Sequence, residues 1–259
     1  MRRAFTLVEV LVTVSIIAML VGLLLGGLRG AGDASRAAKC RRNLRQLFIA
    51  SQGYAACNQG HLPAAVLYFE RDGASRTVAW DFEQQAGVSR PGSLWKFSDT
   101  PQEVQQCPAC LAASTFGADP YTGYHYNTSY LASEGLLPDR DDAGGVIDGW
   151  NRVRAGLSPG QWRRTAEVAM FADGGWKGGA NKFMRAPSAT VEGDVGMVYA
   201  GGSAFRHREQ CNVAWLDGHV DTTGDALQGE HATPALLKSL LDWPRNGFLS
   251  NDDSAYDPR

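Results

Sequence analysis

The residues best suited to chemistry are Cys107 and Cys110, which form a Cys-Pro-Ala-Cys sequence in a chain of 259 residues. A single CxxC pair is compatible with a local disulfide, with half of a zinc site and with a thiol–disulfide active site. Zinc would need two further ligands, for which Cys57, His61 and Cys211 are available without forming a second CxxC pair. The redox site needs a βαβ context, which is not visible here. We expect oxidised structural cysteines, with zinc as the alternative.

The number of cysteines is also informative. The chain has five, so at least one must be free, bonded to another chain or bound to a metal. We assign this role to Cys40, which precedes Cys57 by 17 positions on a predicted helix. At 1.5 Å per residue the two would lie about 25 Å apart, far beyond the reach of a disulfide.

A second candidate site lies near the C-terminus, where nine residues separate His207 from Asp217 and Gly218. Asp-Gly is typical of a tight turn, so we expect His207 to precede a strand that ends at Asp217, without contact between the two side chains. One interpretation is structural, with a turn at Asp217 and His207 hydrogen-bonded to a loop. The other is a cation site, in which calcium would bind Asp217 together with Asp173 or carbonyl oxygens.

The charges divide the chain into two parts. Residues 1–45 contain eight Lys and Arg but only Glu9 and Asp33 as acids, whereas the remainder has 17 basic and 25 acidic residues. The net charge of −2 excludes a uniformly basic nucleic-acid binder, and we expect no nucleic-acid partner. Such a division predicts a stem and a head in different surroundings.

An apolar segment, Val10 to Leu28, contains 19 uncharged residues. As a helix it would be about 28 Å long, which is close to the hydrocarbon thickness of a membrane. We therefore predict a single membrane crossing. A cleaved secretory signal peptide is the alternative, but Glu9 at the start of the apolar run argues against it, because a charge within hydrocarbon is costly.

The residues around this carboxylate, Ala4-Phe5-Thr6-Leu7-Val8-Glu9-Val10-Leu11, resemble the processing site of type IV prepilins and type II secretion pseudopilins. The resemblance implies a leader at residues 1–4, cleavage by prepilin peptidase between Ala4 and Phe5, and N-methylation of Phe5. The family usually has Gly before the cut, where this chain has Ala4. Because the cut precedes the apolar run, the mature protein would keep its anchor.

Glu9 occupies the fifth mature position of that motif. A buried carboxylate requires a cationic partner, and the Phe5 ammonium of a neighbouring subunit is a suitable one. The alternative is a Glu9 that only reaches the lipid headgroups. The segment from His207 to Gly218 also resembles the H-X9-DG motif of large pseudopilin-like proteins that carry the prepilin start.

Periodicity predicts the remaining elements. Small and apolar residues recur every three or four positions from Ala37 to Tyr54, which indicates that the helix continues to about Cys57 and stops at 58–60. Basic residues between 36 and 45 fill its solvated face. We expect strands at 65–69 and 77–82 around a turn at 71–73, a loop-rich region at 86–164, strands at 168–172 and 212–216 that both end in Asp-Gly hairpin turns, and a helix from Pro234 to Trp243.

These elements predict an α+β, pilin-like fold, in which a long N-terminal helix packs on an antiparallel β-sheet head with loop-rich insertions. The expected domain organisation is a leader at 1–4, a transmembrane and filament-core segment at 5–28, an amphipathic continuation at 29–58, and a head at 59–259 that holds the H-X9-DG motif at 207–218.

The function we expect is that of a structural subunit without catalytic residues. After processing by prepilin peptidase it would assemble with other pseudopilin subunits into a type II secretion or type IV pilus-like filament. It would be anchored in inner membrane lipid of a bacterium with its head in the periplasm, although positive-inside counting favours the opposite orientation. The alternatives are a membrane-anchored glycan-binding protein that does not polymerise, and a zinc or thiol enzyme built on Cys107 and Cys110.

Overall fold

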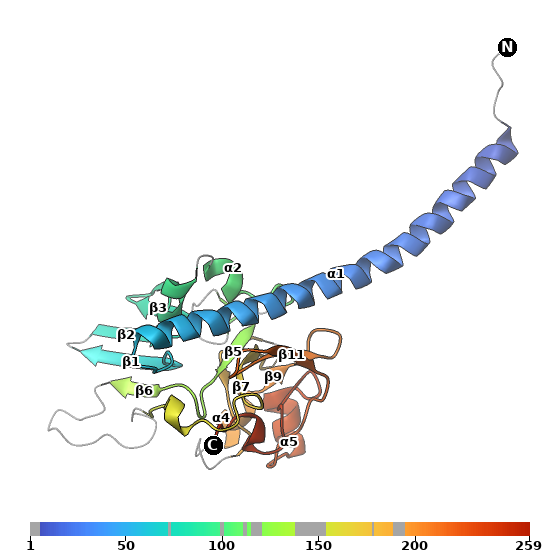
Figure 1. Cartoon of the computed structure of the whole chain (residues 1–259). Coiled ribbons are helices and arrows are strands. Elements are labelled where there is room, and N and C mark those ends of the chain that lie inside the picture. Colours follow the sequence, from blue (N-terminus) through green and yellow to red (C-terminus); the bar gives the residue numbers. More distant parts are fainter. Residues whose placement is uncertain are drawn as a thin grey trace.

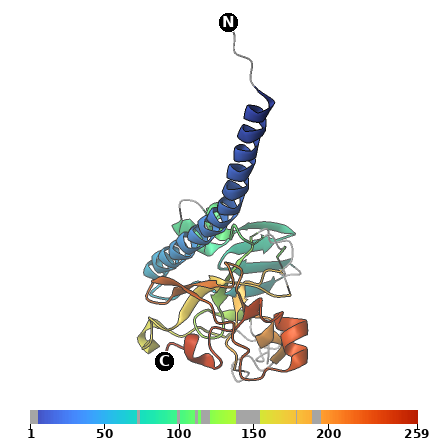
Figure 2. The ribbon, with the colours of Figure 1, turned by 90° about the vertical axis from the view of Figure 1, so that its right-hand side faces the viewer.

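The computed structural model describes residues 6–71, 74–98, 101–110, 113–114, 121–137, 154–177, 179–188 and 195–259. A single helix, α1 (Leu7–Cys57), extends away from the head in its first half and lies along the head in its second half (Figure 1). The same arrangement is visible after a quarter turn (Figure 2). Helix and strands together confirm the α+β class. Ala4, Phe5 and the predicted turn at Asp72 and Gly73 lie outside the described residues.

The ends of α1 follow from local sequence. Thr6 and Glu9 form a capping box at its start, in which each side chain accepts a hydrogen bond from the backbone N–H of the other residue. At the other end Asn58 is the C-cap, and Gly60 adopts a φ of +83°, which a glycine tolerates without a Cβ clash. The predicted end of the helix at Cys57 is therefore confirmed.

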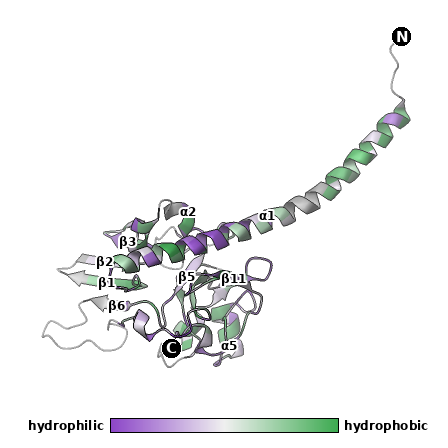
Figure 3. Ribbon diagram, viewed as in Figure 1, coloured by the Kyte–Doolittle hydropathy of each residue, from purple (hydrophilic) through white to green (hydrophobic). Residues whose placement is uncertain are grey.

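The projecting half of α1 is apolar on all sides. Figure 3 shows much of this half in the green of hydrophobic residues, with hydrophilic purple near its start, and exposed fractions are as high as 80% at Leu7 and 72% at Leu23. Across the described part of the chain, no helix combines the length and the apolarity of a membrane crossing. The crossing expected at Val10 to Leu28 therefore stays a prediction.

The second half of α1 is amphipathic, as predicted. Cys40, Leu44 and Leu47 are fully buried on the face toward the head, while Arg41 and Arg42 are exposed. Burial of this stripe fixes which side of the helix faces the sheets.

The first sheet has five strands in the order β4-β3-β2-β1-β6, with only the β1–β6 pair parallel. The predicted β1–β2 hairpin is confirmed. The strand predicted at 77–82 is wrong, because β2 ends at Ala79 and β3 starts at Phe82. Trp80 and Asp81 between them are buried in the bend, where the Asp81 carbonyl accepts from Gly92 N. The strands are β1 (Val66–Arg71), β2 (Ala74–Ala79), β3 (Phe82–Gln85), β4 (Val88–Pro91) and β6 (Glu134–Leu137).

The second sheet, in the order β11-β10-β7-β5-β8, supports the inner half of α1. The predicted hairpin at Asp217 is confirmed between β10 and β11, but the one at Asp173 is wrong, because β7 lies between β5 and β10. Strand β5 lies inside the region predicted to be loop-rich; all four of its residues are buried, so it lacks the alternation of an ordinary half-buried strand. The strands are β5 (Tyr124–Asn127), β7 (Ala169–Asp173), β8 (Phe183–Met184), β10 (Cys211–Trp215) and β11 (Val220–Thr223).

Short elements complete the head. The predicted C-terminal helix begins after Thr233, whose hydroxyl accepts from Leu236 N at 3.2 Å, but it ends at Leu241 rather than Trp243 because Asp242 adopts a φ of +61°. These elements are η1 (Ser93–Phe97), α2 (Pro101–Gln105), η3 (Pro159–Gln161), α4 (Val195–Tyr199), β9 (Ser203–Ala204), α5 (Pro234–Leu236), η4 (Leu237–Leu241), β12 (Asn246–Gly247) and η5 (Asp253–Ala255).

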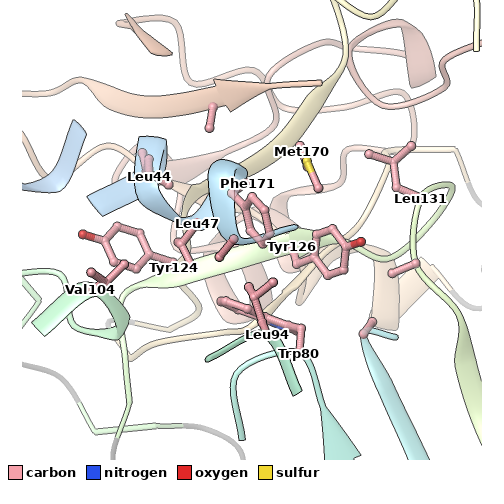
Figure 4. Close-up of a cluster of buried hydrophobic side chains, with 14 of the residues drawn as sticks. Leu44, Leu47, Trp80, Leu94, Val104, Tyr124, Tyr126, Leu131, Met170 and Phe171 are labelled. Carbon is pink, nitrogen blue, oxygen red and sulfur yellow. The ribbon is translucent and has the colours of Figure 1, made fainter. Parts of the chain in front are cut away.

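The core lies where α1 meets the head (Figure 4). Leu44 and Leu47 of α1 join a cluster of aromatic side chains from both sheets. Tyr126 and Phe171 are stacked with ring centroids 4.7 Å apart, and Trp80 lies 5.3 Å from Phe171. Large aromatic rings in such contacts dominate the burial of apolar surface.

Two buried ion pairs also connect the sheets. Lys182 is paired with Asp81, and both side chains are only 2% exposed. Glu134 on β6 accepts two hydrogen bonds of 2.6 Å from Arg185 and a third of 3.0 Å from Arg154. Because buried charges are tolerated only when they are paired, these contacts fix the relative positions of the segments that carry them.

Candidate functional site

The N-terminal end of α1 presents the carboxylate of the predicted assembly motif. Glu9 is exposed, and its Oε2 accepts hydrogen bonds of 2.8 Å from both the backbone N and the hydroxyl of Thr6. In the isolated subunit this carboxylate therefore caps its own helix. The processing residues Ala4 and Phe5 lie outside the described residues.

A second group of reactive side chains lies buried under α1. It comprises Cys40 from the helix, Cys107 from the loop after α2, Asp173 from the end of β7 and His207 from the turn before β10. One ligand atom from each residue lies within 4.8 Å of the others, and all four residues are buried. Sequence positions 40, 107, 173 and 207 thus meet at the junction between the helix and the second sheet.

Contacts within this cluster are close. The sulfur atoms of Cys40 and Cys107 lie 2.7 Å apart, and Cys107 Sγ lies 3.7 Å from His207 Nε2. That nitrogen is also 3.3 Å from Asp173 Oδ2. Two thiols, an imidazole and a carboxylate therefore point at one another inside the protein.

Neighbouring groups hold the carboxylate in place. Asp173 Oδ2 accepts hydrogen bonds from the backbone N of Asn212 at 2.9 Å and from its side-chain amide at 2.8 Å. Its Oδ1 is buried and has no hydrogen-bond partner among the described residues. The guanidinium of Arg206 donates to the carbonyl oxygens of Gly123 and Gly174 beside the cluster and supplies a positive charge there.

The same contacts shift the acidity of the cluster. The hydrogen bond between the two thiols lowers the pKa of Cys107 and raises that of Cys40, because one proton shared across a short contact is held by one sulfur. Burial acts to lower the pKa of His207, but its interactions with Asp173 and Cys107 outweigh burial and raise the value to about 9. The charged imidazolium of His207 is thus stabilised by Asp173 and Cys107 in a buried position, where such interactions are stronger than in water.

The cysteines are not arranged as the sequence predicted. All five are free thiols, so the expected oxidised Cys107–Cys110 pair is not present. Cys40, expected to be the unpaired cysteine, faces Cys107, and the exposed cysteine is Cys57. Cys110 is buried nearby but lies outside the cluster, and so does Cys211, another expected zinc ligand. Helical spacing placed Cys40 on the buried face, yet nothing in the sequence paired it with position 107.

The structure separates the residues of the expected calcium site. Asp173 is buried and faces Asn212 at the start of β10, whereas Asp217 is exposed at the turn after β10, where its Oδ1 lies 2.6 Å from His219 Nδ1. Strand β10 alone places roughly 10 Å between Asn212 and Trp215, and Asp217 lies beyond that strand in the exposed turn, so one ion cannot bind both carboxylates. As expected, His207 precedes the strand and does not touch Asp217.

Gly218, the last residue of the predicted motif, has a packing role. Its carbonyl oxygen accepts a hydrogen bond from Arg45 of α1, and its φ is +93°. A Cβ built there would lie 2.7 Å from Cζ of Phe48. The turn can therefore approach the helix only with a glycine at this position.

Among the residues that the structure describes, Trp and Tyr side chains do not form the exposed surface that a glycan-binding head would need. Most described Trp and Tyr side chains are buried or half-buried, including Trp80, Trp95 and Tyr199 in the core clusters. Among the described residues, Trp243 is the exposed tryptophan, at 40%. The alternative of a glycan-binding function therefore gains no support from the described surface.

A buried histidine beside the cluster predicts a measurable pH dependence. Burial and, to a lesser degree, nearby Arg206 lower the pKa of His125 from 6.5 to about 3, and its Nε2 lies 3.1 Å from Ser203 Oγ. The unfolded chain binds this proton below pH 6.5, so the folded state loses stability as the pH falls toward 3. At pH 5 the loss is about 2 kcal/mol relative to pH 8.

Urea unfolding of His125→Gln at the two pH values checks this expectation. The decrease in the free energy of unfolding between pH 8 and pH 5 should be about 2 kcal/mol smaller in the variant than in the natural protein. His61→Gln, which removes an exposed histidine, is the matched control. If the free energy of unfolding decreased equally in His125→Gln and in the natural protein, the result would contradict the lowered pKa of His125.

Comparison with known proteins supports the interpretation of the N-terminus. Residues 1–25 match the family model of the prokaryotic N-terminal methylation motif. No curated protein and no solved structure matches the chain. The match confirms the resemblance of Ala4–Leu11 to the prepilin-type N-terminus, which implies processing by prepilin peptidase and suggests a pilin-type membrane anchor. Because the matched family model covers only residues 1–25, it does not test the H-X9-DG resemblance at residues 207–218, which stays a prediction.

Proposed function

We propose that this protein is a pseudopilin-like structural subunit that assembles through the first half of α1 into a type II secretion or type IV pilus-like filament. The observation that carries the proposal is the combination of the methylation motif at residues 1–25 with a projecting helix that is apolar on all sides. Exposed apolar surface of this extent requires either lipid or other protein as its environment. A filament of packed helices provides the second, and the bilayer provides the first before assembly.

In this proposal the leader stays in the bacterial cytoplasm, the segment from Val10 to Leu28 crosses the inner membrane once, and the head lies in the periplasm. The head is large and has its own core, so it can present a surface to partners while α1 packs against neighbouring subunits. Peptide mass spectrometry of the membrane-derived protein tests the first step. The expected chain begins at N-methylated Phe5, whereas a chain that begins near Ala31 would identify a secreted protein and overturn the proposal.

Glu9 changes partners in the proposed assembly. In the isolated subunit its Oε2 accepts from Thr6, and its Oε1 has no partner among the described residues. In the filament the carboxylate would pair with the Phe5 ammonium of a neighbouring subunit, away from water. Loss of one partner from such a buried pair costs about 3–5 kcal/mol.

Glu9→Gln tests this pairing, because glutamine keeps the capping hydrogen bonds but removes the charge. We expect an unchanged head and unchanged cleavage, but at least about 100-fold less incorporation into filaments. The measurement is the amount of variant recovered in sheared or crosslinked filaments relative to the membrane fraction. Thr6→Ala is the matched control, since it removes the cap and retains the carboxylate, and it should still assemble. Normal incorporation of Glu9→Gln would contradict the pairing, and filaments in neither natural protein nor variant would contradict the function.

A further inference from the structure

We propose that Cys40, Cys107, Asp173 and His207 form a structural zinc site that fastens α1 to the head. The proposal rests on the buried cluster alone and is independent of filament assembly. It differs from the zinc site considered from the sequence, which used Cys107 and Cys110 with Cys57, His61 or Cys211.

The donor atoms suit zinc better than other common ions. Zinc prefers four ligands drawn from thiolate sulfur, imidazole nitrogen and carboxylate oxygen, whereas calcium and magnesium prefer oxygen alone. The cluster offers two sulfurs, one nitrogen and one oxygen within 4.8 Å of one another. Four protein ligands in a buried position correspond to a closed structural site rather than a catalytic one.

The distances also fit. Ligand atoms around a tetrahedral zinc ion lie roughly 3.3–3.8 Å apart. The observed separations are 3.7 Å between Cys107 Sγ and His207 Nε2 and 3.3 Å between that nitrogen and Asp173 Oδ2. The two sulfurs, at 2.7 Å, would need to move apart by about 1 Å, which rotation of the two side chains can supply.

The surroundings of Asp173 are those of a metal ligand. Its Oδ2 is oriented by both nitrogen donors of Asn212, as outer hydrogen bonds commonly orient metal-bound carboxylates. Its Oδ1 is buried without a hydrogen-bond partner among the described residues, which is unusual in a native structure and would be relieved by an ion that contacts both carboxylate oxygens. A Cys40–Cys107 disulfide would use only the two sulfurs and leave this oxygen unsatisfied.

The charges are balanced when zinc is present. Two thiolates and one carboxylate around a divalent ion leave one negative charge, and the Arg206 guanidinium beside the cluster compensates for it. The four ligands come from α1, the loop after α2, β7 and the turn before β10. One ion would therefore join the helix to three separate segments of the head.

Elemental analysis of the full-length protein, purified in detergent without chelators, tests the proposal. We expect about one zinc per chain in the natural protein and its loss in Cys107→Ser and His207→Ala. Cys110→Ser and Cys57→Ser are the matched controls, because they remove cysteines outside the cluster, and both should retain zinc. Zinc that is lost with Cys110→Ser but retained in Cys107→Ser would overturn the ligand assignment.

A second measurement uses the natural protein, so its outcome does not depend on whether a ligand variant folds. Chelation of the natural protein should lower its unfolding temperature, and added zinc should restore it. Cobalt in place of zinc should give a thiolate-to-cobalt charge-transfer band and the strong visible bands of a tetrahedral ion. Absence of bound zinc together with absence of the cobalt spectrum would overturn the proposal, as would a Cys40–Cys107 disulfide, detected as a mass lower by two hydrogens in protein taken directly from the membrane.

Discussion

Replacement of Glu134 by leucine is expected to lower the free energy of unfolding by about 3–5 kcal/mol. The Glu134 side chain is 6% exposed, and it holds the Arg185 guanidinium, 3% exposed, through two hydrogen bonds of 2.6 Å. Leucine would leave this buried cation without its carboxylate. Arg154, which also donates to Glu134, would lose a partner too. Denaturant unfolding of the full chain in detergent measures the effect.

Glu83→Leu supplies a control on the same sheet. Glu83 accepts from Arg76 at 2.7 Å, but these side chains are 27% and 49% exposed, so water can replace the lost partner. We expect a loss of about 1 kcal/mol or less for this surface pair. A loss in Glu134→Leu no larger than that in Glu83→Leu would show that the buried contacts do not stabilise the head.

Gly218→Ala is expected to destabilise the contact between α1 and the β10–β11 turn by roughly 2–4 kcal/mol. The new methyl group would lie 2.7 Å from Cζ of Phe48 and 2.8 Å from Nη1 of Arg45, and alanine is strained at a φ of +93°. The steric clash and the backbone strain therefore both destabilise the folded state at this one position. The expected readout is a lower midpoint of urea unfolding without a change in its slope.

Gly224→Ala is the matched control for this substitution. Gly224 directly follows β11 in the same hairpin, and a Cβ built there has no atom within 4 Å. Its replacement should change the free energy of unfolding by less than about 1 kcal/mol. Equal effects of the two substitutions would indicate that Phe48 moves aside and that the close approach of the turn is not required.

Helical periodicity was sufficient to predict α1 and its buried face. Cys40, Leu44 and Leu47 follow each other at three- and four-residue steps, and Gln59 and Gly60 end the pattern, so local sequence determines both the face and the end. The hairpins at β1–β2 and β10–β11 were predicted for a related reason, because each connection contains Asp-Gly, a turn signal that depends only on local sequence.

Strand β5 could not be predicted, because its residues have polar groups that only the folded protein satisfies. His125 bonds Ser203, and Asn127 donates to the carbonyl oxygens of Ala169 and Tyr256 at 2.9 Å each. A buried strand of this kind has neither alternation nor a continuous apolar run. Burial of β5 depends on partners more than 40 positions away in the chain.

The candidate metal cluster was beyond prediction for a related reason. Cys107 was singled out by its spacing from Cys110, and His207 by its spacing from Asp217, yet each belongs with residues of other segments. Spacing detects ligands that lie on one turn or one helix. It does not detect four ligands that separate segments bring together only when α1 docks on the second sheet.

The exposure of Cys57 gives the chain a reporter of its own folding. The other four cysteines are buried, so a thiol-reactive dye should label the folded protein at one position, at the end of α1. Labelling of the remaining four requires the helix to leave the sheet or the head to open. The ratio of fast to slow labelling would then report how often this junction opens, in membranes as well as in detergent, without any engineered probe.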